Sequence, residues 1–65
     1  MYRVISRLDD EPWKSEGEFR LKKVALDIAK RLSRERHVIV RRYDDGVGVL
    51  VYEACRGQVY TRGGD

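Results

Sequence analysis

The chain has a single histidine and a single cysteine, His37 and Cys55, which are its best candidates for covalent chemistry. A histidine beside a cysteine can generate a thiolate nucleophile. The two residues lie at the outer ends of two β-forming runs, and a hairpin would bring them to the same open end. No third group that would orient the imidazole is evident, and 65 residues leave little room for a substrate cavity as well as a core. We therefore predict a protein that is not an enzyme and has no catalytic residues.

Carboxylates that are adjacent in the chain are the second candidate for chemistry, because hard cations prefer oxygen ligands. They occur in the runs 9–11 and 44–45, and neither run has the spacing of a calcium-binding loop. One cysteine and one histidine are too few for a structural zinc site. The glycines Gly46, Gly48 and Gly57 do not form a phosphate-binding motif. The sequence therefore predicts no metal and no cofactor.

The basic and aromatic residues are candidates for binding a partner and not for catalysis. The net charge is +3, and the excess lies in residues 14–36, which carry eight basic and four acidic residues. This imbalance suits either nucleic acid or an acidic protein surface. The predicted partner-binding residues lie on the helix and the hairpin described below: Lys22, Lys23, Lys30, Arg41, Tyr43, Val49 and Tyr52.

The composition is that of a small globular protein, with 42% hydrophobic and 38% charged residues. The length indicates one domain over residues 1–65, with a core in about 1–62 and a flexible tail at 63–65. The single cysteine excludes an internal disulfide and suits a reducing compartment. No apolar run approaches the roughly 20 residues of a membrane span. We expect a cytoplasmic protein that does not bind membranes.

The elements upstream of the hairpin are a strand and a helix. Residues 1–7 include β-branched and aromatic residues and no strand breaker, which predicts a strand that ends at the acidic residues before Pro12. Trp13 follows and is expected to close one end of the sheet–helix interface, with an exposed anchor as the alternative. An apolar stripe from Leu21 to Leu32 predicts a helix over about 21–34.

The start of this helix is ambiguous. A capping-box pattern at Ser15–Glu18 would begin it at Glu16, but Gly17 is a poor helix residue and the segment could be extended instead. A start at Glu16 would leave Phe19 and Leu26 exposed, opposite the apolar stripe. Because burying a Phe stabilises the fold by about 2 kcal/mol, we favour the start near Leu21, which lets Phe19 turn inward.

The segment 37–54 predicts the hairpin around which the fold is built. Its strands flank Asp44-Asp45-Gly46, which suits a turn with either two or three loop residues. Strict alternation would place Val47, Val49 and Val51 on one face of the second strand. Leu50, Tyr52 and Ala54 would then occupy the other face. Both faces would thus be largely apolar, and the pattern does not decide which of them meets the helix.

Together these features predict an α+β fold of order β-α-β-β, with a short fourth strand near residues 59–62 as an option. One helix would pack across a three- to four-stranded antiparallel sheet. One helix covers only one face of a sheet, so the other face would be left for a partner. The predicted function is that of a small adaptor, inhibitor or regulator that docks an exposed sheet face and a basic rim on a partner protein. A nucleic-acid-binding module using Arg, Lys and Tyr on sheet and helix is the alternative, and pairing with a second copy stays open.

Overall fold

A computed structural model describes residues 1–62 of the chain, with side chains for residues 1–60. The predicted tail at 63–65 lies outside the described residues. The elements, in chain order, are β1 (Tyr2–Arg7), β2 (Lys14–Phe19), α1 (Lys22–Leu32), β3 (His37–Asp44), β4 (Val47–Cys55) and β5 (Gln58–Arg62).

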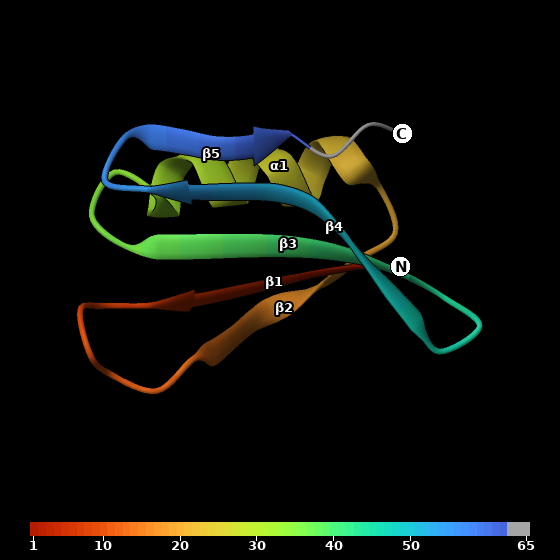
Figure 1. Ribbon diagram of the computed structural model, residues 1–65. Helices are drawn as coiled ribbons and strands as arrows, with labels where there is room; N and C mark the ends of the chain where they lie inside the picture. The colour runs from red at the N-terminus through yellow and green to blue at the C-terminus, as the bar shows by residue number, and fades with distance from the viewer. Residues whose placement is uncertain (63–65) are drawn as a thin grey trace.

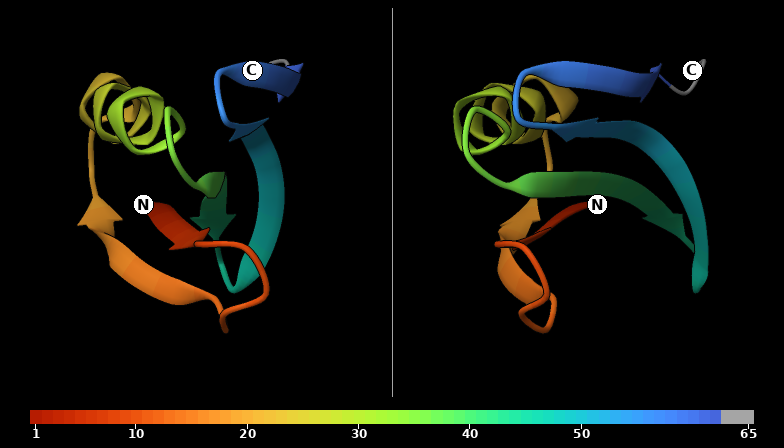
Figure 2. Two further views of the ribbon diagram at one scale, coloured as in Figure 1. Left: turned by 90° about the vertical axis from the view of Figure 1, so that its left-hand side faces the viewer. Right: turned by 60° about the vertical axis from the view of Figure 1, so that its left-hand side comes forward.

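The five strands form one antiparallel sheet of order β2-β1-β3-β4-β5, and α1 packs against one of its faces (Figure 1). The sheet is strongly curved, and the helix lies on its concave side (Figure 2). The predicted α+β fold is confirmed, including the optional last strand. The predicted number of strands was too low by one, because residues 14–19 form β2.

The element β2 is weak as an isolated strand, since it has the sequence KSEGEF and contains Gly17 with φ of +131°. The backbone hydrogen bonds of its pairing with β1 stabilise it as a strand, although its residues have low strand propensity. The helix then begins at Lys22 with Leu21 as N-cap, which confirms the later start. Phe19 packs against the core from the end of β2, as the later start requires.

The β3–β4 turn has two loop residues. Asp44 pairs with Val47, and Asp45 and Gly46 between them both have positive φ, 52° and 83°. This combination is that of a type I′ turn, whose twist matches that of the flanking strands. The two-residue alternative is therefore the correct one.

The hydrophobic core lies between α1 and the concave face of the sheet. Val4, Val38 and Val40 are fully buried, and Ala25 and Ala29 meet them from the helix. The small alanine side chains let the helix approach the strands closely. The face of the hairpin that carries Val38 and Val40 is thus the one that the helix covers.

The alternation predicted for β4 is wrong at one point, because a bulge interrupts the strand. Val40 pairs with Tyr52, but the next residue, Arg41, pairs with Leu50, so Val51 is the extra residue. Leu50 and Tyr52 therefore lie on opposite faces, with Tyr52 in the core and Leu50 on the convex side. Sequence alternation cannot show an inserted residue, since a bulge depends on the pairing of two strands.

The helix is also rotated relative to its predicted apolar stripe. Ala25 and Ala29 face the sheet and Leu26 packs against the core, whereas Val24 is 40% and Leu21 65% exposed. The predicted position of Leu26 opposite the buried side is therefore wrong. The sheet curves around the helix (Figure 2), and Leu26 is among the partly buried residues that pack against the core.

Candidate functional site

The convex face of the sheet, which we call the open face, is not covered by any described element of the chain (Figure 2). Strand register places the side chains of β1, β3 and β4 that alternate with the core residues on this face. They are Arg3, Ile5, Arg7, His37, Ile39, Arg41, Tyr43, Leu50, Glu53 and Cys55.

The middle of the open face is apolar. Ile5 and Ile39 are directly paired across β1 and β3, and both are half-buried. Leu50 pairs with Arg41 on the adjoining strand and is 38% exposed. Cross-strand aliphatic pairs of this kind are usually covered, because each exposed side chain forgoes the stabilisation that burial would provide.

One end of the open face is built around Tyr43. The Arg3 guanidinium lies 4.9 Å from the centre of the Tyr43 ring, and it also pairs with Glu18 at 3.5 Å. Gly48, the cross-strand partner of Tyr43, leaves space for the ring, since a Cβ at Gly48 would lie 2.7 Å from Cε1 of Tyr43. Glycine thus lets Tyr43 lie flat against the sheet, where Arg3 holds it.

The other end is a cluster of rings around His37. The imidazole makes an edge contact with Trp13 at 5.0 Å between centroids, and Tyr60 lies at 6.2 Å. His37 Nε2 donates a hydrogen bond of 2.7 Å to Glu53 Oε2, and the Arg7 guanidinium lies 4.9 Å from the Trp13 ring centre. Trp13 is 37% exposed on the open face, so the prediction that it closes the sheet–helix interface is wrong.

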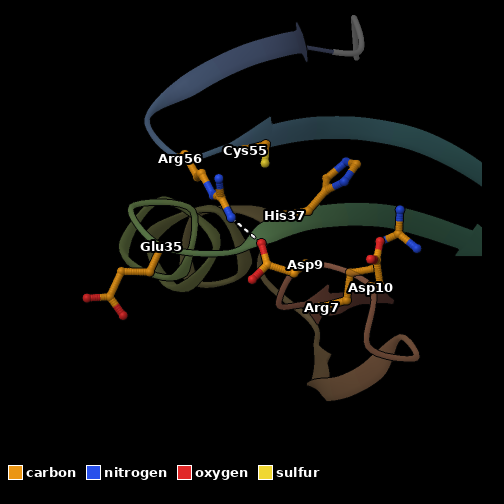
Figure 3. Close-up of a pocket in the computed structure, with 7 residues that line it drawn as sticks. All are labelled: Arg7, Asp9, Asp10, Glu35, His37, Cys55 and Arg56. Atoms are coloured by element: carbon orange, nitrogen blue, oxygen red, sulfur yellow. Dashed lines mark hydrogen bonds and ion pairs between the residues drawn. The ribbon is translucent and has the colours of Figure 1, made fainter.

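The predicted proximity of His37 and Cys55 is confirmed, since the two residues are cross-strand partners. They line an open hollow of about 500 Å³ at the end of the sheet, together with Arg7, Asp9, Asp10, Glu35 and Arg56 (Figure 3). Asp9 and Arg56 form an ion pair within it. Among the described residues no hydrogen bond joins Cys55 to His37, whose Nε2 is bonded to Glu53.

Glu53 is the orienting group that sequence inspection missed. It lies sixteen residues after His37 and two before Cys55, and only the β3–β4 register brings the carboxylate to the imidazole. The hollow carries charges of both signs, two arginines and three carboxylates, so it does not favour an ion of either sign. In residues 1–62 no group of three or more His, Cys, Asp or Glu side chains is arranged to hold a metal ion.

The structure distributes the predicted partner-binding residues over several places. Arg41 and Tyr43 lie on the open face, but Tyr52 is 5% exposed in the core. Val49 pairs with Arg42 and therefore lies on the concave side, beyond the helix. The lysines belong to the helix on that same side: Lys22, Lys23 and Lys30.

Several residues of the open face were not predicted, although the alternation of the first strand contains a signal for them. Arg3, Ile5 and Arg7 share one face of β1, and that face became informative only when its pairing with β3 was known. Trp13 carries no such signal, because it precedes β2 and its direction is set by contacts with His37 and Arg7.

Comparisons of the chain with protein-family models, with curated proteins and with solved structures found no match. No described helix is long and apolar enough to cross a membrane. Function is therefore inferred from the arrangement of the chain's own residues.

Proposed function

We propose that this chain is a small non-enzymatic module that binds a partner protein through the open face, as an adaptor or inhibitor does. The observation that carries the proposal is an apolar row in the middle of an uncovered sheet face. It consists of the partly exposed cross-strand pair Ile5 and Ile39 together with Leu50, which is 38% exposed and lies on β4 opposite Arg41. An apolar centre of this kind gains stability when a partner removes it from water.

The composition of the surrounding rim supports a protein as the partner. Arg, Trp and Tyr are the residue types that most often dominate the binding energy of protein interfaces. Here Trp13 and Tyr43 flank the apolar row, and each is held in place by an arginine guanidinium. Rings that are already held lose less conformational entropy on binding.

The charges of the open face indicate the chemistry of the partner. Its acidic residue Glu53 is engaged by His37, and Glu18 at the β2 edge is engaged by Arg3. Arg41 is exposed and forms no ion pair with a described residue. We therefore propose a partner whose apolar patch is bordered by carboxylates. A second copy of the chain fits this face less well, because the arginines of two open faces would oppose each other.

The proposal is tested with two matched double variants. Leu50→Asp with Arg41→Glu alters the open face. Val24→Asp with Lys23→Glu makes the same kinds of substitution on α1, where Lys23, like Arg41, is exposed and forms no ion pair with a described residue. Leu50 and Val24 have nearly equal exposure, 38% and 40%. Partners retained by the immobilised wild-type chain are identified by mass spectrometry, and the Kd of each purified partner is then measured by calorimetry.

We expect the open-face pair to weaken binding of the partner by about 30-fold or more, since two contacts of roughly 1–2 kcal/mol each are removed or reversed. The helix-side pair should change the Kd less than threefold. Circular dichroism verifies that both variants are folded. A Kd that is unchanged by the open-face pair, or reduced affinity with the helix-side pair alone, would refute the proposal.

A further inference from the structure

The exposed side of α1 and the turn after it carry a second charged surface, which faces away from the sheet. Relative to the buried Ala25 and Ala29, the residues on the opposite side of the helical wheel are polar and exposed. We call this surface the basic helix face, and its members are Lys23, Asp27, Lys30, Arg31 and Arg34.

The cations of this face are available to an external anion. The five members include four cations and one carboxylate, and all five are exposed. Within residues 1–62, none of the four cations forms an ion pair with a carboxylate. Elsewhere in the described chain Arg3, Lys14, Arg42 and Arg56 each pair with a carboxylate. Other cations without an ion pair to a described residue, such as Arg20 and Arg41, lie on different elements, whereas these four lie together on one side of α1 and the turn after it.

The arrangement of these charges suits a regular array of anions. Lys23 and Lys30 are seven residues apart and lie about 10 Å apart along the helix axis. Duplex DNA carries one phosphate charge per roughly 1.7 Å of its axis, so this length of helix can face several phosphates. The face contains no aromatic ring, and so it has no platform on which the bases of a single strand would stack.

An anionic membrane is a less suitable occupant. A helix that binds a membrane surface buries its apolar side among the lipids. In this protein that side is occupied, since Ala25 and Ala29 are fully buried against the sheet and Leu26 packs against the core. Only Leu21 and Val24 on one flank are exposed, at 65% and 40%, so the helix offers a membrane two apolar side chains and not a whole apolar side.

We infer that the basic helix face binds the phosphate backbone of a nucleic-acid duplex, without reading its base sequence. The surface is separate from the open face, so this binding does not depend on the proposed protein partner. A chain with both activities would hold a protein partner on one side and a duplex on the other.

The test is a fluorescence anisotropy titration of a labelled 20-base-pair DNA duplex at 50, 100 and 200 mM salt. Lys23→Gln with Lys30→Gln removes two charges from the basic helix face, and Gln retains helix propensity. The control, Lys14→Gln with Arg56→Gln, removes the same net charge from outside the basic helix face. Both of these residues are exposed and each forms an ion pair with a carboxylate of the chain.

For the wild-type chain the slope of log K against log salt should be close to −3.6, roughly 0.9 for each of four neutralised phosphates. The Lys23 and Lys30 variant should have a slope near −1.8 and, for equal affinities at 1 M salt, bind about 200-fold more weakly at 50 mM salt. The control should stay within twofold of wild type. A duplex of unrelated base sequence should bind equally well.

Three outcomes would overturn the inference. The first is no change in anisotropy at 50 mM salt with 100 μM protein. The second is equal weakening by both pairs of substitutions, which would mean that binding follows net charge and not this face. The third is cosedimentation with vesicles that contain phosphatidylserine while the duplex does not bind, which would identify a membrane as the occupant.

Discussion

Gly48 and Tyr43 illustrate at the residue scale how the open face is shaped. The Tyr43 ring occupies the space that a side chain at position 48 would fill, and Arg3 contacts the ring from 4.9 Å. Glycine inside a strand ordinarily destabilises it by about 0.5–1 kcal/mol relative to alanine. Its presence here is explained by the ring that lies over it.

This geometry predicts that Gly48→Ala has opposite effects in two backgrounds. In the wild-type chain the new methyl group should displace the Tyr43 ring and lower the free energy of unfolding by about 1 kcal/mol. In a Tyr43→Ala background the same substitution should raise it by about 0.5 kcal/mol, since only the strand preference remains. Urea unfolding of the four proteins measures the difference. The same sign in both backgrounds would contradict the described packing of the ring.

The hydrogen bond between Ser6 and Glu16 is a second residue-scale feature, and it ties β2 to β1. Ser6 is fully buried, and its Oγ donates to Glu16 Oε2 at 2.5 Å beside the irregular pairing of the two strands. A buried hydroxyl without a partner costs about 1–3 kcal/mol.

Glu16→Ala should therefore lower the free energy of unfolding by about 1–3 kcal/mol, because it leaves the Ser6 hydroxyl unpaired. The double variant Ser6→Ala with Glu16→Ala should recover most of this loss, since neither polar group then remains. Chemical denaturation measures both values. The pairing would have no energetic role if the double variant were as unstable as the sum of the two single variants.

At the scale of elements, the rotation of α1 decides which helix positions tolerate larger side chains. Ala29 is fully buried against the strands, whereas Val24 on the apolar stripe is 40% exposed. The sequence stripe alone would treat these two positions as equivalent core residues.

We expect Ala29→Leu to destabilise the fold by about 1–3 kcal/mol through overpacking, while Val24→Ala costs less than about 1 kcal/mol. Thermal unfolding followed by circular dichroism provides the comparison. A larger loss for Val24→Ala than for Ala29→Leu would show that the helix faces the sheet with its predicted stripe.

At the scale of the whole molecule, α1 lies on the concave side of the five-stranded sheet, opposite the open face (Figure 2). The basic helix face is the side of α1 opposite the buried Ala25 and Ala29, so it is directed away from the sheet. Ligands on the two surfaces do not compete for the same atoms. A ligand that binds only the folded chain must also stabilise it by mass action.

A DNA duplex at 100 times its Kd should raise the free energy of unfolding by about 2.7 kcal/mol. For a domain of this size that corresponds to an increase in Tm of roughly 20 °C. The sole tryptophan, Trp13, reports unfolding by its fluorescence, and it lies away from the basic helix face. The increase should disappear in the Lys23→Gln, Lys30→Gln variant under the same concentrations, and an equal increase there would contradict the assignment.

The amino-acid sequence by itself determined the elements that depend on interactions between residues close together in the chain. Helix periodicity, β-branched runs and the Asp45-Gly46 turn placed α1, β1 and the β3–β4 hairpin, because each depends on neighbours a few residues away. The prediction that one sheet face would stay uncovered also followed, since the sequence contains one amphipathic helical stripe and one helix covers one face of a sheet. The proximity of His37 and Cys55 followed from hairpin geometry alone.

Only the tertiary structure decided the features that depend on pairing between distant strands. The strand β2 formed because β1 was beside it, and the bulge at Val51 put Leu50 and Tyr52 on opposite faces. The rotation of α1 is known only from its contacts with the sheet, because a helical wheel carries no information about the surface against which the helix packs. The predicted binding residues consequently divided between the open face, the core and the helix. Their directions are set by long-range contacts, and a one-residue change of register is enough to reverse them.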